Sequence, residues 1–182
     1  MLRKLSSFLS LLLLVGCATQ RIPFPAAELS ALHLAGDKTV KGTVFLVDQL
    51  EERQVGADSE VTLEPVCSYS EHWYEVAYLG NRSLGKPDPR YEKYVRRTTA
   101  DAAGQFSFTG VAPGAYLLTA PLFWAATTCS GNVAKTKVMI ARKITIKADD
   151  PVVEIPLTKK YVSSIVVCDL YNQGAWEKEL GR

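Results

Sequence analysis

The stretch 101–118, DAAGQFSFTGVAPGAYLL, constrains the fold of this chain more than any other part of it. Asp101 and Gly104 predict a tight turn, because Asp hydrogen-bonds its own backbone and Gly adopts a positive φ without steric cost. The Gln-Phe-Ser-Phe run that follows alternates polar and aromatic side chains, which is the period of a half-buried strand. A Pro-Gly turn then leads into a second run, Ala-Tyr-Leu-Leu. Two strands joined in this way predict the middle of an antiparallel sheet.

Short runs of this kind recur along the chain. Strands are expected near residues 39–47, 59–67, 94–99, 105–109, 115–127, 133–147, 151–157 and 161–168. Short strands separated by Gly, Pro and Asn turns are typical of packed antiparallel sheets rather than of a parallel sheet. The sequence therefore predicts an all-β antiparallel sandwich of about seven or eight strands. It spans residues 38–168 and is followed by a C-terminal tail, 169–182.

Two motifs in this region resemble the carboxypeptidase regulatory-like domains, a family of transthyretin-like sandwiches. The run Asp101-Ala-Ala-Gly-Gln-Phe-Ser-Phe and the later Gly110-Val-Ala-Pro-Gly-Ala-Tyr are similar to that family's strand and turn motifs. The run Val40-Lys-Gly-Thr-Val-Phe-Leu-Val resembles the family's opening strand. The resemblance covers residues 38–158 and implies a transthyretin-like β-sandwich. It implies little about activity, because one fold hosts many functions.

The first 16 residues predict a lipoprotein signal peptide. Arg3 and Lys4 form a positively charged start, and residues 5–15 are largely apolar. This apolar run is too short to span a membrane, which takes about 20 residues of helix, so the segment indicates secretion. Its removal leaves 19 basic and 19 acidic residues, because the signal holds two basic residues and no acid. A neutral mature chain gives no reason to expect a nucleic-acid partner.

Cleavage and anchoring are expected at Cys17. The run Leu14-Val15-Gly16-Cys17 resembles a bacterial lipobox, which implies that Cys17 becomes the acylated first residue. Several acyl chains hold a protein firmly, since each buried methylene contributes about 0.8 kcal/mol. Ala18 follows, whereas Asp at that position would resemble an inner-membrane retention signal. We therefore expect a lipoprotein that is attached to the outer membrane through the acyl chains on Cys17 and faces the periplasm.

Residues 17–37 are expected to be the lipidated N-terminus and a tether. Within them, 26–35 predicts a short helix. This helix either packs on the sandwich through Leu29 and Leu32 or belongs to a loose linker between lipid and domain. The sequence leaves both alternatives open.

A long insertion, 68–97, separates two of the expected strands. Loops of this length are usually functional or disordered, and this one is too rich in aromatic residues for simple disorder. Aromatic and arginine side chains dominate measured binding hot spots, so Trp73, Tyr91 and Arg96 are the candidate binding residues. The alternative is that the aromatic side chains only cover an open face of the sandwich.

Catalytic and metal-binding motifs are weak in this sequence. His72 and Glu75 have the His-x-x-Glu spacing of zinc carboxypeptidases, but a catalytic zinc usually takes three protein ligands. The other histidine, His33, lies upstream in the tether. The sequence holds no Gly-x-Ser-x-Gly elbow, phosphate loop or Cys-x-x-Cys pair. We therefore expect neither an enzyme nor a bound metal or cofactor.

Three cysteines remain for an oxidising compartment once Cys17 is acylated. They are Cys67, Cys129 and Cys168, which allow three pairings. Cys67 and Cys129 both follow expected core strands, so this pair is the expected disulfide. In the chain-entropy model a bridge that closes about 60 residues contributes roughly 4 kcal/mol. Cys168 is expected to be a buried apolar thiol, with an intermolecular disulfide as the alternative.

Two classes of function follow from these features. The first is a non-enzymatic module that gives structure to the cell envelope or binds another envelope protein. The alternative is a glycan- or peptidoglycan-binding module that uses the aromatic insertion 68–97. We do not expect a free small molecule as the ligand.

Overall fold

Residues 19–48, 51–127 and 133–160 are described by the structure, which is a computed structural model. The signal peptide, Cys17, Cys129, Cys168, the expected strand 161–168 and the tail 169–182 lie outside these described residues. Among the helices within the described ranges, none is both long and apolar enough to cross a membrane.

The first sheet is built around strand β1 (Ala35–Val47). Along one edge, β1 pairs antiparallel with β5 (Gln105–Val111) and then, further along, with β2 (Arg53–Val55). Along its other edge it pairs in parallel with β8 (Val152–Lys160). Strand β1 is therefore hydrogen-bonded on both sides and forms the centre of its sheet.

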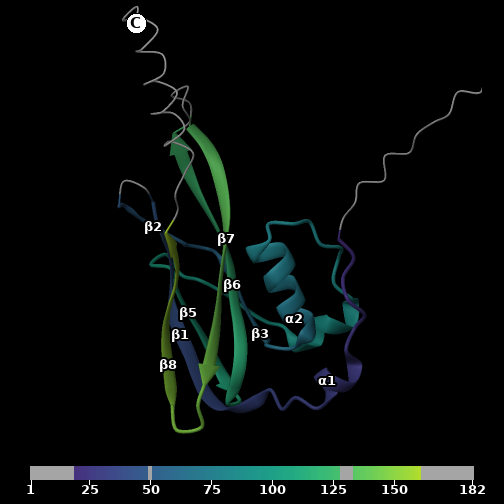
Figure 1. The fold of residues 1–182 in the computed structure, drawn as a ribbon. Coiled ribbons are helices and arrows are strands. Elements are labelled where there is room, and N and C mark those ends of the chain that lie inside the picture. Colours follow the sequence, from purple (N-terminus) through teal and green to yellow (C-terminus); the bar gives the residue numbers. More distant parts are fainter. Residues whose placement is uncertain (1–18, 49–50, 128–132, 161–182) are drawn as a thin grey trace, which may run out of the picture.

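The second sheet is antiparallel throughout, in the order β4-β3-β6-β7. Its strands are β4 (Arg96–Thr99), β3 (Glu60–Pro65), β6 (Gly114–Thr127) and β7 (Val133–Ile146). Strands β6 and β7 form a long hairpin that pairs without a bulge, from Gly114 opposite Ile146 to Thr127 opposite Val133. Figure 1 shows the two sheets stacked against each other, with this hairpin extending beyond them.

The space between the sheets holds the main hydrophobic core. Alternate residues of each strand point into it, as the two-residue period of a strand requires. Leu63 comes from β3, and Phe106 and Phe108 come from β5. Tyr116 of β6 is also buried, and its hydroxyl donates a hydrogen bond to the Ala112 carbonyl at 3.0 Å. The all-β sandwich predicted from the sequence is confirmed, and it is antiparallel apart from the pair β1 and β8. The two strands joined by the Pro-Gly turn, β5 and β6, belong to different sheets, so the prediction that together they form the middle of one sheet is wrong.

The turn predicted at Asp101 and Gly104 is present. The Asp101 carboxylate accepts hydrogen bonds from the backbone N–H groups of Ala103 at 2.9 Å and Gln105 at 2.8 Å. Gly104 has a φ of 76°, and a Cβ there would lie 2.6 Å from the carbonyl oxygen of Val44 on the neighbouring strand. Glycine meets both conditions without strain, so this turn fixes where β5 begins.

A helical layer covers the outer face of the second sheet (Figure 1). It consists of α1 (Ala26–Ser30), α2 (Ser68–Trp73), the π-helix η1 (Tyr74–Leu79) and the 3-10 helix η2 (Pro89–Tyr94). Leu29, Cys67, Tyr69 and Tyr91 form a second buried cluster inside this layer. The insertion is therefore folded, and it supplies both a cover for the sheet and a small core of its own.

The N-terminal segment belongs to the folded domain. Residues 19–34, which the sequence assigns to the tether, pack on the insertion, and Leu29 is fully buried there. The Glu28 carboxylate accepts hydrogen bonds from the Ser68 N–H at 2.9 Å and the Ser68 hydroxyl at 2.5 Å. Of the two alternatives left open, the structure shows a packed helix, seated on the insertion. Strand β1 begins at Ala35, within the segment expected to be tether.

Cys67 is a buried free thiol in this structure. Its expected disulfide partner, Cys129, lies outside the described residues, so this pairing stays a prediction.

Candidate functional site

A cavity of about 200 Å³ lies between the outer face of the second sheet and the helical layer. Its floor is formed by outward-facing residues of β3 and β6, namely Thr62, Glu64 and Thr119. Its walls include three aromatic residues of the insertion, namely Tyr69, Trp73 and Tyr91. The insertion therefore turns one face of the sandwich into a cavity with a polar floor and aromatic walls.

Glu64 reaches the cavity through the alternation of β3. Its neighbour Leu63 faces the core between the sheets, so the Glu64 side chain points to the outer face. There the Tyr91 hydroxyl donates a hydrogen bond to its carboxylate. Burial raises the pKa of Glu64 above its ordinary value, against the opposing effects of this hydrogen bond and of the positive charges on Arg21 and Arg97.

Tyr91 closes the cavity on the side of Cys67. It is only 6% exposed, and its hydroxyl oxygen lies 4.0 Å from the Cys67 Sγ. Burial above all, and then the nearby Glu64 and Cys67 side chains, raise the pKa of Tyr91. The hydroxyl therefore stays protonated and remains a hydrogen-bond donor to Glu64.

The other two aromatic walls are held by their own contacts. The Tyr69 hydroxyl accepts a hydrogen bond from the Asp88 N–H at 2.7 Å, and its ring meets Phe24 edge-on at 6.2 Å between centroids. The Trp73 ring stacks on Tyr78 at 6.1 Å with an interplanar angle of 20°. Because these rings are packed against neighbours, the walls are in position without a ligand.

Helix α2 is fixed to the sheet by Ser70, which is buried. Its hydroxyl donates a hydrogen bond to the Pro65 carbonyl at 2.8 Å and accepts one from the Cys67 N–H at 2.9 Å. The first turn of α2 is therefore joined to the end of β3, the strand that carries the cavity floor.

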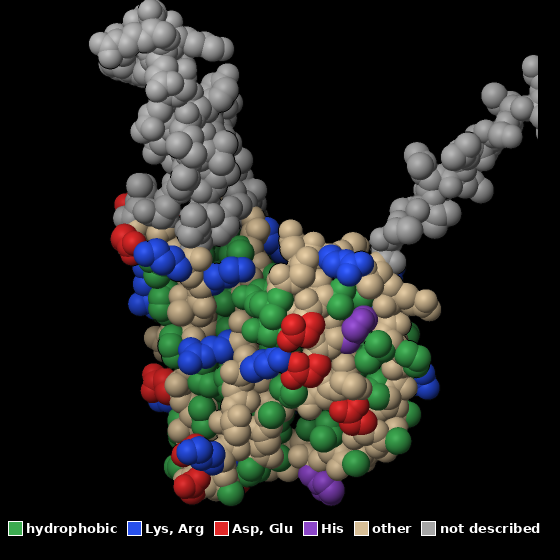
Figure 2. Space-filling view, in the orientation of Figure 1, with side chains coloured by type: hydrophobic (Ala, Val, Ile, Leu, Met, Phe, Trp, Pro, Cys, Tyr) green, Lys and Arg blue, Asp and Glu red, His purple; other side chains and the backbone are tan. Residues whose placement is uncertain are grey.

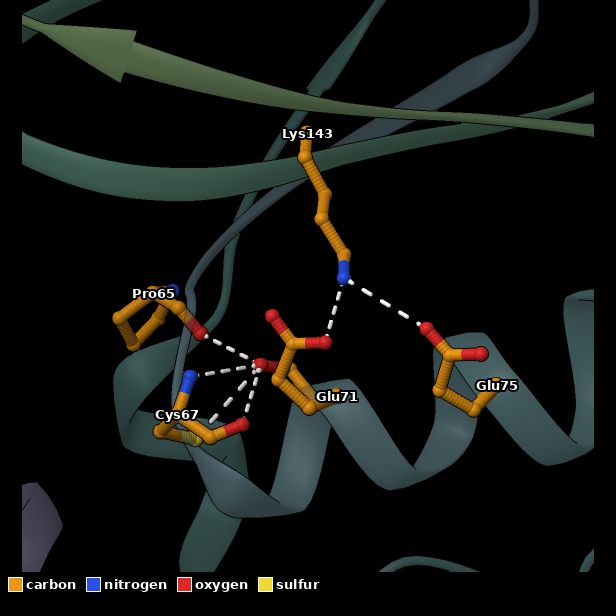
Figure 3. Close-up of polar contacts among 6 residues, drawn as sticks. Pro65, Cys67, Glu71, Glu75 and Lys143 are labelled. Carbon is orange, nitrogen blue, oxygen red and sulfur yellow. Dashed lines mark hydrogen bonds and ion pairs between the residues drawn. The ribbon is translucent and has the colours of Figure 1, made fainter.

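A second contact, from Lys143 of β7, holds the same helix one turn later. Figure 3 shows its ammonium group between the Glu71 and Glu75 carboxylates, with Glu75 at 3.8 Å. Figure 2 shows acidic and basic side chains meeting on this face of the molecule. Glu75 thus pairs with a lysine. Within the described ranges, no group of three His, Cys, Asp or Glu residues is placed to hold a metal ion.

Two arginines lie at the edge of the cavity. The Arg21 Nε donates to the Gly85 carbonyl at 2.5 Å. Arg97 pairs with the Glu92 carboxylate and, at 3.4 Å, with Glu60. Since a guanidinium group has five N–H donors, both arginines keep donors beyond these contacts.

The structure brings two of the three predicted binding residues, Trp73 and Tyr91, to one cavity and places Arg96 elsewhere. The Arg96 guanidinium donates to the carbonyls of Thr109 at 2.6 Å and Gly110 at 3.4 Å. These contacts join β4 to β5 across the edge of the sandwich, so Arg96 connects the two sheets.

Sequence reasoning missed Glu64, the half-buried carboxylate on the floor of the cavity. A signal was present, because Glu64 is an acid in the otherwise uncharged run Val-Thr-Leu-Glu-Pro directly before the aromatic insertion. This acid can be recognised as part of the cavity only once it is known that the insertion folds back over the outer face of β3.

The chain is therefore a β-sandwich with a cavity between one sheet and a helical cover. A solved structure of a proposed carbohydrate-binding protein from Pseudomonas aeruginosa is similar, with a TM-score of 0.67 and 26% sequence identity, over 76% of this chain and 99% of that chain. A 9R-lipoxygenase from Cyanothece matches 78% of this chain and 18% of its own, with 10% identity and a TM-score of 0.30, too low to carry an argument. No family model and no curated protein matches the chain. The resemblance to carboxypeptidase regulatory-like domains therefore stays a prediction beyond the sandwich itself.

Proposed function

We propose that this chain is a non-enzymatic carbohydrate-binding module of the bacterial cell envelope. The observation that carries the proposal is the half-buried Glu64 carboxylate on the floor of a cavity whose walls are Tyr69, Trp73 and Tyr91. The similarity to a proposed carbohydrate-binding protein supports the same class of ligand. Of the two functions considered from the sequence, the cavity favours glycan binding over a purely structural role.

Sugars present two kinds of surface, and the cavity offers a partner for each. The C–H groups on one face of a pyranose ring carry partial positive charge and pack on the negative face of an aromatic ring. The hydroxyl groups donate to carboxylates and accept from guanidinium groups, and hydrogen bonds to charged partners are the stronger ones. Trp73 supplies the aromatic surface, Glu64 the acceptor, and Arg21 and Arg97 the donors.

The size of the cavity limits what enters it. Its volume of about 200 Å³ is below the roughly 300–1,000 Å³ typical of sites for drug-sized ligands. It therefore holds one sugar ring, and the rest of a longer glycan lies outside it.

A glycan array probed with the purified protein tests this function, followed by titration of the best ligand into two variants. Glu64→Gln keeps the shape of the side chain and removes its charge, so we expect binding to weaken about tenfold. Trp73→Ala removes the aromatic surface and should weaken binding at least as much. Lys41→Gln, on the first sheet, is the control and should bind as the wild type does. Glycan binding that survives both cavity variants in folded protein would refute this site.

We also propose that the module is anchored to the outer membrane through acyl chains on Cys17. Its motivation is the lipobox ending at that residue. Cys17→Ser should move the protein from the membrane fraction to the soluble periplasm. A variant that still sediments with membranes after a high-salt wash would show that the anchor lies elsewhere.

A further inference from the structure

A second cavity, of about 290 Å³, lies where η1 meets strands β7 and β8. Tyr78 and Asn81 line it from the helical side, and Met139 lines it from β7. On the face seen in Figure 2, hydrophobic side chains gather between basic and acidic ones. The function proposed above does not use this cavity.

Two lysines give the second cavity its charge. Lys137 and Lys159 both line it, and no acidic residue does. Lys159 Nζ lies 4.9 Å from the centre of the Tyr78 ring, and Lys137 Nζ lies 5.4 Å from that of Phe123. Among the described residues, neither ammonium group has a carboxylate within salt-bridge distance, whereas Lys143 nearby is paired with two acids. The second cavity is therefore a cationic site lined by an aromatic ring.

Trp73 connects the two cavities, because it lines both of them. Its ring is stacked on Tyr78, which belongs to the second cavity. A ligand that packs on the indole in the first cavity is therefore next to the second one. Since the first cavity has room for a single ring, the second cavity is the neighbouring space into which a glycan of two or more residues can extend.

We infer that the two cavities are neighbouring subsites for an anionic glycan, with a neutral sugar above Glu64 and a sugar carboxylate beside Lys137 and Lys159. The uronic acids are the class of sugar that fits this second subsite. Three acidic residues, Glu64, Asp88 and Glu92, line the first cavity against two arginines, so its lining disfavours an anion, whereas two lysines and no acid line the second and attract one. This inference rests on the proposed carbohydrate-binding function.

Calorimetric titration of the purified protein in non-ionic detergent tests the inference. The probes are a uronic-acid oligosaccharide and the same oligosaccharide with its carboxylates reduced to alcohols. We expect the acidic form to bind roughly tenfold more tightly at low salt, the scale of a charge-assisted hydrogen bond. The difference should shrink as salt screens the ammonium groups.

The matched variants are Lys137→Gln/Lys159→Gln and, as control, Lys41→Gln/Lys147→Gln, which removes the same charge away from both cavities. The first should bind the acidic and the neutral oligosaccharide equally well, and the control should keep the preference. If the wild type binds both forms equally, or the control loses the preference as fully as the cavity variant, the anionic subsite is wrong while glycan binding stands. If neither oligosaccharide binds and the glycan array is also blank, both the inference and the proposed function fail.

Discussion

The hydroxyl of Tyr91 donates a hydrogen bond to the carboxylate of Glu64 across the boundary between the helical layer and the second sheet. One partner belongs to the insertion, and the other belongs to the strand that the insertion covers. The contact shapes the cavity and also attaches its cover. Tyr91, predicted from the sequence as a binding residue, therefore has a structural role, and its binding role stays a prediction.

Replacing Tyr91 with alanine should destabilise the protein rather than only weaken binding. Truncation of a buried aromatic residue costs about 3–5 kcal/mol of unfolding free energy. Tyr91→Phe removes only the hydroxyl and should cost about 1–3 kcal/mol, because Glu64 loses its donor. Urea denaturation measures both. Tyr94→Phe, in the same 3-10 helix, is the control and should change little. A Tyr91→Ala variant within about 1 kcal/mol of wild type would show that the layer does not depend on this residue.

The raised pKa of Glu64 predicts how stability depends on pH. Since the folded-state pKa lies above the ordinary 4.5, the folded protein binds more protons than the unfolded chain just above that pH. The unfolding free energy should therefore fall as the pH rises through this range. Glu64→Gln should remove this slope in a series of thermal midpoints. A slope unchanged in that variant would mean that another group causes it.

Asp88 provides the matched comparison on the acid side. Hydrogen bonds from Arg90 lower the pKa of Asp88 from 3.8 to about 2. Its contribution to the unfolding free energy is therefore present above pH 3.8 and is lost as the pH falls through the folded-state pKa of about 2. Asp88→Asn should change the pH dependence of the unfolding free energy only below pH 3.8. Glu64→Gln should change it only above pH 4.5.

Gly104→Ala should destabilise the turn before β5. A non-glycine residue in the left-handed region costs about 1–2 kcal/mol, and its Cβ would also lie 2.6 Å from the Val44 carbonyl oxygen. Gly85→Ala is the control, because nothing lies within 4 Å of a Cβ built there. Chemical denaturation of the two variants should separate them by at least about 1 kcal/mol; equal stabilities would contradict the strain at Gly104.

Ser70 and Lys143 both hold helix α2, but they should contribute very differently to stability. Ser70→Ala leaves the buried N–H of Cys67 without its acceptor, which costs about 1–3 kcal/mol. Lys143→Met breaks a solvent-exposed ion pair, and such pairs contribute about 0–1 kcal/mol. The ion pair should therefore matter less than the single hydroxyl when the unfolding free energies are compared. The reverse order would mean that the lysine, not the serine, attaches the helix.

Local signals predicted the parts of the fold that depend on local chemistry. The turn at Asp101 and Gly104 and the strands near 115–127 and 133–147 are visible in the sequence because turn residues and strand periods are short-range properties. Strand β2 was not predicted, because its three residues, Arg53–Val55, are too short for a periodic signal. The parallel pairing of β8 with β1 joins segments more than 100 residues apart, which no local pattern reports.

The site was predictable only in part for the same reason. Aromatic composition pointed to Trp73 and Tyr91, but it could not separate them from Arg96, whose side chain contacts the other sheet. The direction of each side chain depends on which face of β3 the insertion covers. Glu64 acquires its role only when that packing is known.

The contacts of Thr19 would set the distance between the domain and the membrane if Cys17 carries the proposed acyl chains. Thr19 is already part of the fold, since its N–H donates to the Ser83 carbonyl at 3.0 Å and it pairs with Leu84 of the insertion. With the anchor proposed at Cys17, two residues link the acyl chains to the domain, a reach of about 7 Å. Two residues are too few to act as a flexible linker, so the domain would stay close to its anchor. The domain would be held at the membrane surface, and its cavities could bind only glycans that come within a domain's width of the bilayer.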